Sequence, residues 1–486
     1  MATETSVGTP PGDPSPTAPE RPSLTSVLRS LLLRLHFYAG VFVAPFLLVA
    51  AVSGLLYALS PQAERIVYDH ELRVPAGEEE LPLSEQIAAA RADYPEGEIS
   101  AIRPSPKEGE TTRVLLSGVP GVTEGHTLAV FVDPYTAEVR GALEQYGTSG
   151  ALPLRTWIDE LHRDLHLGQP GRMYSEFAAS WLWIITGAGL VLWLGRARAR
   201  RKVRGTAGRR RLLGLHGTVG VWAAVGLFFI SATGLTWSTY AGSRVEELRT
   251  SIGQATPVVA TDTGHAGHEG HGSDGGHAGH EGHQGHEGHE GHGGASGGEM
   301  AAEGVGVDDV LSAARAEGLS NPVELVPPAD ENTAWVVQQI QRSWPEKQDA
   351  AAIDPATGEV LDVVRFADYP LLAKLARWGI DLHMGSLFGL PNQIALALLA
   401  VSLITLIVLG YRMWWRRGRA GAFGRPIPRG AWRQMPRPVL LGLVAGLVLL
   451  GWFLPLFGIP LAAFLLVDVC LGWRARRRAA AAANGG

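Results

Sequence analysis

Long apolar runs alternate with polar segments along this chain of 486 residues. Four runs are long enough, or nearly so, to cross the ~30 Å hydrocarbon core of a bilayer as helices. They cover residues 31–59, 177–194, 212–237 and 394–409. A further apolar stretch, 438–473, is too long for one span and is interrupted around Pro455–Pro460, so it predicts a hairpin of two helices. The pattern predicts an α-helical integral membrane protein with about six spans.

The two long polar segments between the spans repeat one order of elements. A helical apolar pattern comes first, then alternating segments typical of short strands, then an Asp-Pro turn and a last strand. The helices are expected over 84–94 and 308–317, and the strands near 99–103, 112–116, 128–132 and 139 in the first segment and near 323–326, 334–339, 350–353 and 360 in the second. Asp133-Pro134 and Asp354-Pro355 begin the turns, where Asp can accept hydrogen bonds from the following amides. Each segment predicts a small α+β domain, with one helix on an antiparallel sheet.

Basic residues indicate the orientation in the membrane. Arg and Lys gather in the links 196–211 and 412–437 and in the tail after 473, which places these parts on the cytoplasmic side. Both termini are then cytoplasmic, and the two α+β domains lie outside the plasma membrane. The net charge of −5 adds little, because the charge is segregated between the two sides. The single cysteine, Cys470, excludes a disulfide framework, a thiolate metal cluster and covalent haem attachment.

These observations predict the following division of the chain. It consists of a disordered tail (1–28), TM1 (29–59), extracytoplasmic domain 1 (60–174), TM2 (175–195), a basic link (196–211), TM3 (212–238), extracytoplasmic domain 2 (239–385), TM4 (386–411), a second basic link (412–437), a TM5–TM6 hairpin (438–473) and a cytoplasmic tail (474–486).

The chain contains an internal duplication, and both copies carry histidines at matched places. At a constant offset of 180 residues, Leu35-His36 and Ser53-Gly54-Leu55 recur as Leu215-His216 and Thr233-Gly234-Leu235. At a constant offset of 221 residues, Leu161-His162 recurs as Leu382-His383. The duplication therefore selects four of the sixteen histidines. On the expected topology, His36 and His216 lie near the cytoplasmic face, and His162 and His383 lie near the outer face.

The same motifs resemble those of the PepSY-associated transmembrane family. The resemblance rests on the turns Val132-Asp133-Pro134-Tyr135-Thr136 and Ile353-Asp354-Pro355-Ala356-Thr357-Gly358, on Leu161-His162-Arg163, and on Leu382-His383 followed by Gly389-Leu390-Pro391. It covers roughly residues 28–415. It implies PepSY-like outer domains and, because some members are similar to dihaem ferric-siderophore reductases, a haem-binding four-helix core. The terminal hairpin and a histidine-rich insert depart from the family pattern.

Two facing imidazoles are a standard way to hold an iron porphyrin through its axial positions. We therefore expect His36 and His216 to bind an inner b-type haem and His162 and His383 an outer one. Gly40 and Gly220 would let the flat ring approach the helices, although close helix packing explains these glycines equally well. A bare metal ion would be short of ligands with two histidines alone.

His166 is a weaker alternative ligand. It follows His162 by four residues, so both could lie on one face of a helix. Its repeat-matched residue is Leu387, however, so the duplication does not support it.

A low-complexity tract within residues 264–294 carries the remaining candidate ligands. Its histidines are His265, His268, His271, His277, His280, His283, His286, His289 and His292. Such a composition predicts disorder, and its imidazole density suits labile binding of copper, nickel or zinc. A drifting triplet repeat that binds metal only incidentally is the alternative.

The sequence favours a transmembrane dihaem protein that reduces a ferric siderophore or another ferric chelate on the outer side. No nucleotide, flavin or nicotinamide fingerprint is present, so the electron donor would be a separate molecule. Two other functions remain open: a non-enzymatic protein that handles copper, nickel or zinc, and a PepSY-type regulator of a protease or sensor.

Overall fold

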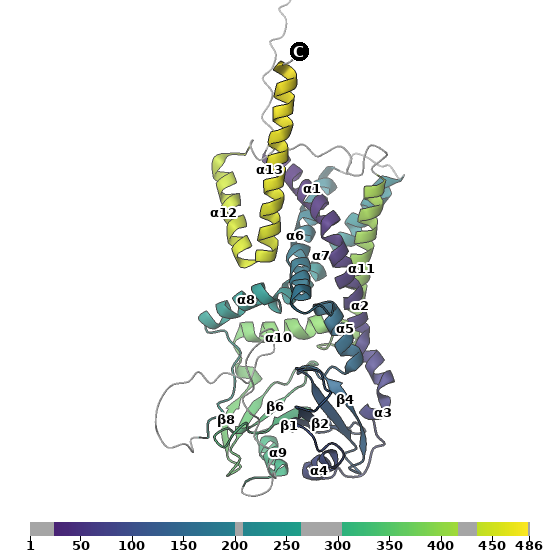
Figure 1. Cartoon of the computed structure of the whole chain (residues 1–486), viewed down its shortest axis with the longest axis vertical. Helices are drawn as coiled ribbons and strands as arrows, with labels where there is room; N and C mark the ends of the chain where they lie inside the picture. Colours follow the sequence, from purple (N-terminus) through teal and green to yellow (C-terminus); the bar gives the residue numbers. More distant parts are fainter. Residues whose placement is uncertain (1–23, 200–207, 264–303, 417–434, 485–486) are drawn as a thin grey trace, which may run out of the picture.

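The computed structural model describes residues 24–199, 208–263, 304–416 and 435–484. Figure 1 shows an elongated molecule in layers: long helices at one end, shorter crosswise helices in the middle, and a β-sheet with two covering helices at the other end. The long helices are α1 (Leu24–Phe42), α2 (Ala44–Val67), α6 (Gln169–Ala199), α7 (Arg209–Thr236), α11 (Leu390–Trp415), α12 (Arg437–Phe453) and α13 (Pro455–Asn484). The middle layer holds α5 (Pro153–Arg163), α8 (Thr239–Ser251) and α10 (Leu371–Met384).

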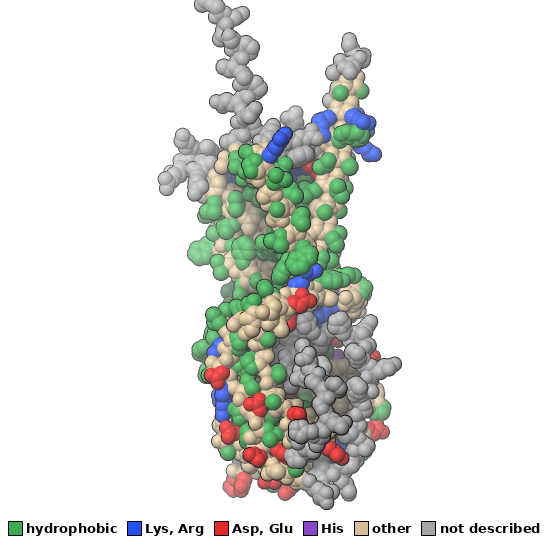
Figure 2. Space-filling view, turned by 90° about the vertical axis from the view of Figure 1, so that its left-hand side faces the viewer, with side chains coloured by type: hydrophobic (Ala, Val, Ile, Leu, Met, Phe, Trp, Pro, Cys, Tyr) green, Lys and Arg blue, Asp and Glu red, His purple; other side chains and the backbone are tan. Residues whose placement is uncertain are grey.

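Five helices in the described part of the chain are long and apolar enough to cross a membrane: α2, α6, α7, α11 and α13. The 17-residue α12 is a shorter apolar helix that pairs with α13 in a hairpin. Figure 2 shows hydrophobic side chains covering the helical end, acidic side chains gathered on the sheet end, and basic side chains at the opposite tip. The apolar surface is what a bilayer requires of a spanning bundle.

The first predicted span is not one straight helix. It divides into α1 and α2 at Val43, because Pro45 has no N–H to donate to the carbonyl of Val41. The hydroxyl of Tyr411 in α11 donates to that carbonyl at 2.9 Å. A side chain from the second copy thus satisfies the backbone acceptor that the proline leaves without its usual partner.

The terminal hairpin packs against the duplicated bundle. Phe457 of α13 is 1% exposed, and its ring lies 5.0 Å from that of Trp181 in α6. Arg34 of α1 forms a buried ion pair with Asp468 of α13. These contacts fix the hairpin to α1 and α6 rather than leaving it as an independent pair of helices.

Every predicted strand is present, and the two predicted α+β units share one sheet. Within the described residues, eight strands form one antiparallel sheet in the order β4-β3-β2-β1-β5-β6-β7-β8. They are β1 (Glu98–Arg103), β2 (Thr112–Ser117), β3 (Thr127–Val132), β4 (Val139–Gln145), β5 (Val323–Val326), β6 (Trp335–Gln339), β7 (Ala350–Ile353) and β8 (Val360–Val364). The two copies meet where Ile102 of β1 pairs with Leu325 of β5. Joining the two edge strands satisfies backbone groups that separate domains would expose.

One hydrophobic core serves both halves of the sheet. Helices α4 (Leu83–Asp93) and α9 (Val307–Ala316) lie side by side on the face turned away from the bundle (Figure 1). Their buried residues share a single cluster with inward-facing residues of both halves. The predicted turns have the expected chemistry, since the carboxylates of Asp133 and Asp354 accept hydrogen bonds from the amides of Tyr135 and Ala356 at 2.8 and 2.7 Å.

Candidate functional site

Two of the four repeat-matched histidines face each other at the end of the bundle away from the sheet. His36 lies on α1 and His216 on α7, and we call them the sheet-distal pair. Their ring centroids are 6.2 Å apart, and the ring planes are inclined by 77°. The structure thus brings together two residues that are 180 positions apart in the sequence.

Both imidazoles of this pair are oriented by backbone carbonyls. His36 Nδ1 lies 2.9 Å from the carbonyl oxygen of Ile185 in α6, and His216 Nδ1 lies 3.2 Å from that of Leu406 in α11. A carbonyl can only accept, so each Nδ1 carries the proton and donates it. The Nε2 atom of each ring then presents its lone pair. Ile185 and Leu406 are themselves matched at the offset of 221, a role that their aliphatic side chains do not reveal in the sequence.

A cavity of about 290 Å³ surrounds the sheet-distal pair. Gly40, Gly220, Gly189 and Gly410 contribute to its lining. A Cβ atom at Gly189 would lie only 3.0 Å from His36 Cε1, whereas one at Gly40 or Gly410 would meet no atom within 4 Å. Gly40 and Gly410 therefore border open space that a flat ligand could occupy, and Gly189 lets the His36 ring pack against α6. Gly189 and Gly410 form another repeat-matched pair, which the sequence interpretation missed.

The other two histidines lie near the sheet, and we call them the sheet-proximal pair. His162 is on α5 and His383 on α10. Each Nδ1 lies beside a hydroxyl: Ser53 Oγ of α2 at 2.9 Å from His162, and Thr233 Oγ1 of α7 at 2.6 Å from His383. Ser53 and Thr233 are matched in the duplication.

The hydroxyls beside the sheet-proximal pair also contact backbone carbonyls of their own helices. Ser53 donates its hydroxyl proton to the carbonyl of Val49 at 2.9 Å, and Thr233 donates its own to the carbonyl of Phe229 at 2.8 Å. A hydroxyl that donates to its own helix leaves its oxygen able to accept from the imidazole Nδ1–H. With Nδ1 protonated, all four histidines would present Nε2 as a lone-pair donor.

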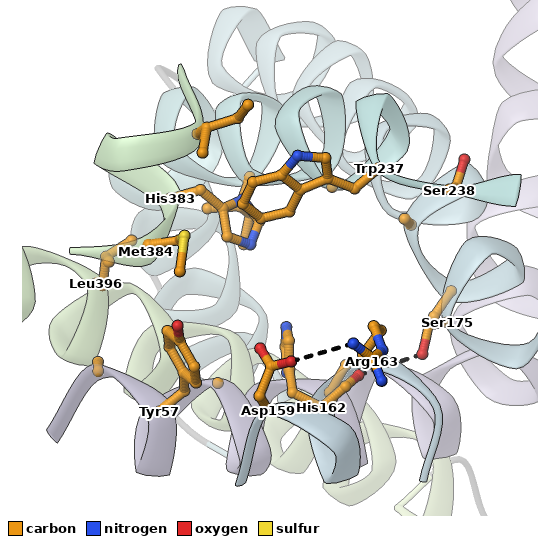
Figure 3. A pocket seen from close by; sticks show the side chains of 18 of the residues that line it. Tyr57, Asp159, His162, Arg163, Ser175, Trp237, Ser238, His383, Met384 and Leu396 are labelled. Atoms are coloured by element: carbon orange, nitrogen blue, oxygen red, sulfur yellow. Dashed lines mark hydrogen bonds and ion pairs between the residues drawn. The ribbon is translucent and has the colours of Figure 1, made fainter. Parts of the chain in front are cut away.

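Both members of the sheet-proximal pair line one cavity of about 370 Å³, drawn in Figure 3. Gly54 and Gly234 lie against the two imidazoles: a Cβ atom would come within 3.2 Å of His162 and 3.6 Å of His383. Burial lowers the pKa of His162, and burial together with the neighbouring His162 lowers the pKa of His383 to about 4. Both rings are therefore neutral at pH 7, as ligation requires.

His166 does not join either pair. Its Nδ1 lies 3.1 Å from Glu160 Oε2, and its backbone has φ of 55°, which turns it away after the end of α5. It is absent from the lining of both cavities. The nine histidines from His265 to His292 lie outside the described residues. Within the described part of the chain, no group of three or more His, Cys, Asp or Glu side chains could hold a metal ion.

Comparison with known proteins identifies the family. The family described as the PepSY-associated TM region matches residues 33–417, which include all four paired histidines and both halves of the sheet. The terminal hairpin lies beyond the match. No curated protein matches the chain. Because the match covers well over half of the sequence, the chain belongs to the PepSY-associated TM region family.

Proposed function

We propose that this protein holds two b-type haems and carries electrons across the plasma membrane to a ferric chelate. The observation that carries the proposal is the sheet-distal pair. Two imidazoles that bind one iron atom from opposite sides place their ring centroids about 6 Å apart, because each metal–nitrogen bond is about 2.0 Å long. The centroids of His36 and His216 are 6.2 Å apart.

The surroundings of the four histidines also fit axial ligation. Metal-binding histidines generally donate their second ring nitrogen to a carbonyl or another acceptor, which fixes the tautomer and the ring orientation. All four have such a partner beside Nδ1, namely Ile185, Leu406, Ser53 and Thr233. A bundle core with inward-facing histidines on opposing helices is a common setting for haem.

The two cavities lie next to each other along the bundle. Leu47, Leu182 and Leu403 line both of them, so a single apolar layer separates the two sites. Haem iron, when bound, supplies one-electron chemistry by cycling between the ferric and ferrous states. Four imidazoles held at two depths of one bundle thus favour an electron-transfer path with two haem sites.

The protein's own contribution to this activity is to bind and orient the two haems and to insulate them from water. The apolar walls exclude water and influence the potential of each site, and the hydrogen-bonded imidazoles set the ligand field. With the basic links on the cytoplasmic side, the sheet-proximal site lies outside, where an acceptor can reach it. A ferric siderophore or another ferric chelate would accept one electron there. The resulting ferrous ion is held less tightly by oxygen donors.

A visible spectrum of the purified protein tests the proposal. We expect a sharp Soret band, resolved α and β bands of low-spin haem after dithionite, and close to two haems per chain by pyridine haemochrome. In proteoliposomes with an internal reductant, an external ferric chelate should be reduced. Protein that is colourless when made in haem-replete cells would refute the proposal in favour of a metal-handling or regulatory role.

A further inference from the structure

Large apolar side chains lie exposed beside both helices that carry the sheet-proximal pair. In the first copy, Trp157 of α5 and Leu167, which follows this helix, are each more than half exposed. At the offset of 221 they match Trp378 of α10 and Phe388, and Phe388 is also more than half exposed. The duplication has therefore kept an apolar surface at the same place in both copies.

A side chain from the sheet extends this surface in the second copy. Trp344, in the loop between β6 and β7, is more than half exposed, and its ring centroid lies 6.0 Å from that of Trp378 and 6.4 Å from that of Phe388. Its backbone amide donates to the carbonyl of Leu387 at 2.7 Å. We call Trp344, Trp378 and Phe388 the second-copy patch.

The matching residues of the first copy also form a group. The ring centroid of Trp157 lies 5.1 Å from that of His166, the neighbour of Leu167 in the sequence. We call Trp157 and Leu167 the first-copy patch. Single exposed apolar residues are ordinary on protein surfaces, whereas grouped ones mark a surface that binds something apolar.

The two patches lie at one height along the molecule. Figure 1 shows α5 and α10 together in the crosswise layer between the long helices and the sheet. An axis along the membrane normal relates the copies of a parallel repeat, so matched residues lie at one depth on different sides of the bundle. A partner protein that docked on one side would not require the matching patch on the other side, but a surface that surrounds the molecule would.

The second-copy patch continues into the surface of a spanning helix. Phe388 lies just before α11, whose side chains Leu390, Ile394 and Leu398 are spaced by four residues and are each more than half exposed. This spacing places the three on one face of the helix. Since α11 is long and apolar enough to cross a membrane, that face meets acyl chains, and the patch stands where the acyl chains end.

The terminal hairpin places another aromatic ring beside the crosswise layer. Trp452, near the end of α12, is more than half exposed, and the guanidinium of Arg244 in α8 lies over its ring at 4.3 Å from the centroid. Tryptophan is enriched where headgroups meet acyl chains, because its ring is apolar and its N–H is polar. Three separate parts of the fold thus present tryptophan near this layer.

We propose that the first-copy and second-copy patches are inserted into the headgroup region of the leaflet on the sheet side, where they bind phospholipid. The crosswise layer then lies in the membrane surface, and lipid contacts on two sides of the bundle fix the depth of the sheet. This binding surface lies outside the spanning helices and does not depend on the cofactor content of the bundle.

Spin labelling of the full chain in phosphatidylcholine liposomes measures these depths. In a Cys470→Ser background, which removes the single native cysteine, nitroxides are attached through Trp157→Cys, Leu167→Cys, Trp344→Cys and Phe388→Cys. Collision rates with oxygen and with nickel(II) ethylenediaminediacetate report the depth of each label. We expect all four labels within about 5–10 Å of the boundary between headgroups and acyl chains. Because the four positions report separately, loss of one variant leaves the test intact.

Three reference labels calibrate the measurement. Glu138→Cys and Glu359→Cys are matched, exposed positions at the ends of β4 and β8 remote from the crosswise layer, and they should be fully accessible to nickel. Leu398→Cys should be accessible to oxygen and shielded from nickel. Labels of either patch that collide with nickel as often as the two glutamate positions would place that patch in water and overturn the proposal. Labels shielded from both reagents would reveal a protein–protein contact there, which would also overturn it.

Discussion

Each paired histidine uses one ring nitrogen for the protein and leaves the other for a ligand. The acceptors for Nδ1 are themselves duplicated: carbonyls of Ile185 and Leu406 for one pair, and hydroxyls of Ser53 and Thr233 for the other. Four imidazoles that each have a repeat-matched partner beside Nδ1 are not needed for helix packing. They are what two axial pairs require.

Substitution of the histidines tests the pairing. We expect His36→Ala and His216→Ala to deplete one haem, and His162→Ala and His383→Ala to deplete the other. Where haem persists on a single histidine, electron paramagnetic resonance should show a change from low to high spin. His166→Ala is the control and should change neither spin state nor haem content. Depletion of the same haem by His36→Ala and His383→Ala would contradict the pairing.

The hydroxyl that orients His383 is a second target at this scale. Thr233→Val removes the acceptor for Nδ1–H while keeping the side-chain shape, and loss of such a partner typically weakens metal binding about 10- to 100-fold. We expect faster transfer of one haem to apomyoglobin, with the other unaffected. Thr405→Val is the matched control, because its hydroxyl bonds only the carbonyl of Val401 on the exposed side of α11. Equal rates in both variants would show that Thr233 has no such role.

At the scale of elements, the sequence predicted helices and strands well because their local patterns are strong. Helix α4 begins at Leu83 where the pattern predicted 84, and β5 and β7 have the predicted bounds. The division of the first span at Val43 was missed, because Pro45 stands inside a continuous apolar run. The partner that compensates for this proline, Tyr411, lies 366 positions further along and could not be identified from local pattern.

The candidate site shows the same limit. The duplication selected the four histidines, but it could not reveal which backbone carbonyls they contact, since every residue has one. It also gave no indication that β1 and β5 would pair, because a strand edge carries the same donors and acceptors whatever its partner. Long-range pairing is determined by packing of the whole domain rather than by the residues of either strand.

Helix α10, which carries His383, is attached to the sheet by a buried group of ionisable side chains. Arg377 of α10 binds Glu346 at 2.7 Å and Asp381 at 3.1 Å, and both carboxylates are fully buried. Glu346 lies between β6 and β7, so the group joins the sheet to the helix beneath the histidine. Burial, and then the neighbouring Asp381, raises the pKa of Glu346 to about 9.

This pKa predicts a pH dependence of stability. A carboxyl group whose pKa is raised on folding binds a proton more tightly in the folded state, so its contribution is fully present below the ordinary pKa of about 4.5 and is lost as the pH rises toward 9. Between about pH 5 and about pH 9, we expect the melting temperature of the wild type to fall more steeply with pH than the melting temperature of Glu346→Gln. Glu359→Gln, at an exposed turn, should keep the slope of the wild type. Parallel curves for Glu346→Gln and the wild type would contradict the assignment.

At the scale of the whole molecule, a buried ion pair links the two duplicated halves of the sheet. Arg103 of β1 binds Glu324 of β5 across the centre of the sheet at 2.5 Å, and both residues are less than 10% exposed. Arg103 also donates to the carbonyl of Thr148, in the loop that lines the sheet-proximal cavity. The junction of the sheet is therefore connected to the site.

Removing one partner of this ion pair should lower the free energy of unfolding more than replacing both partners with apolar residues. Glu324→Gln leaves a buried guanidinium without its counter-ion, which typically costs about 3–5 kcal/mol. The double variant Arg103→Met with Glu324→Leu should recover most of that loss. Chemical denaturation of the detergent-solubilised protein measures both effects. A loss below about 1 kcal/mol for Glu324→Gln, the range of exposed pairs, would show that the junction does not depend on this contact.

Each histidine pair and the centre of the sheet take one partner from each copy. During synthesis, His36 emerges early, but its partner His216 follows 180 residues later, and the carbonyl of Leu406 that orients His216 follows 190 residues after that. The first copy thus enters the membrane with half of each site, and neither site is complete until α11 has been made. On the proposed function, haem would be captured only after translation of more than four fifths of the chain, so the holoprotein would assemble late in synthesis or after it.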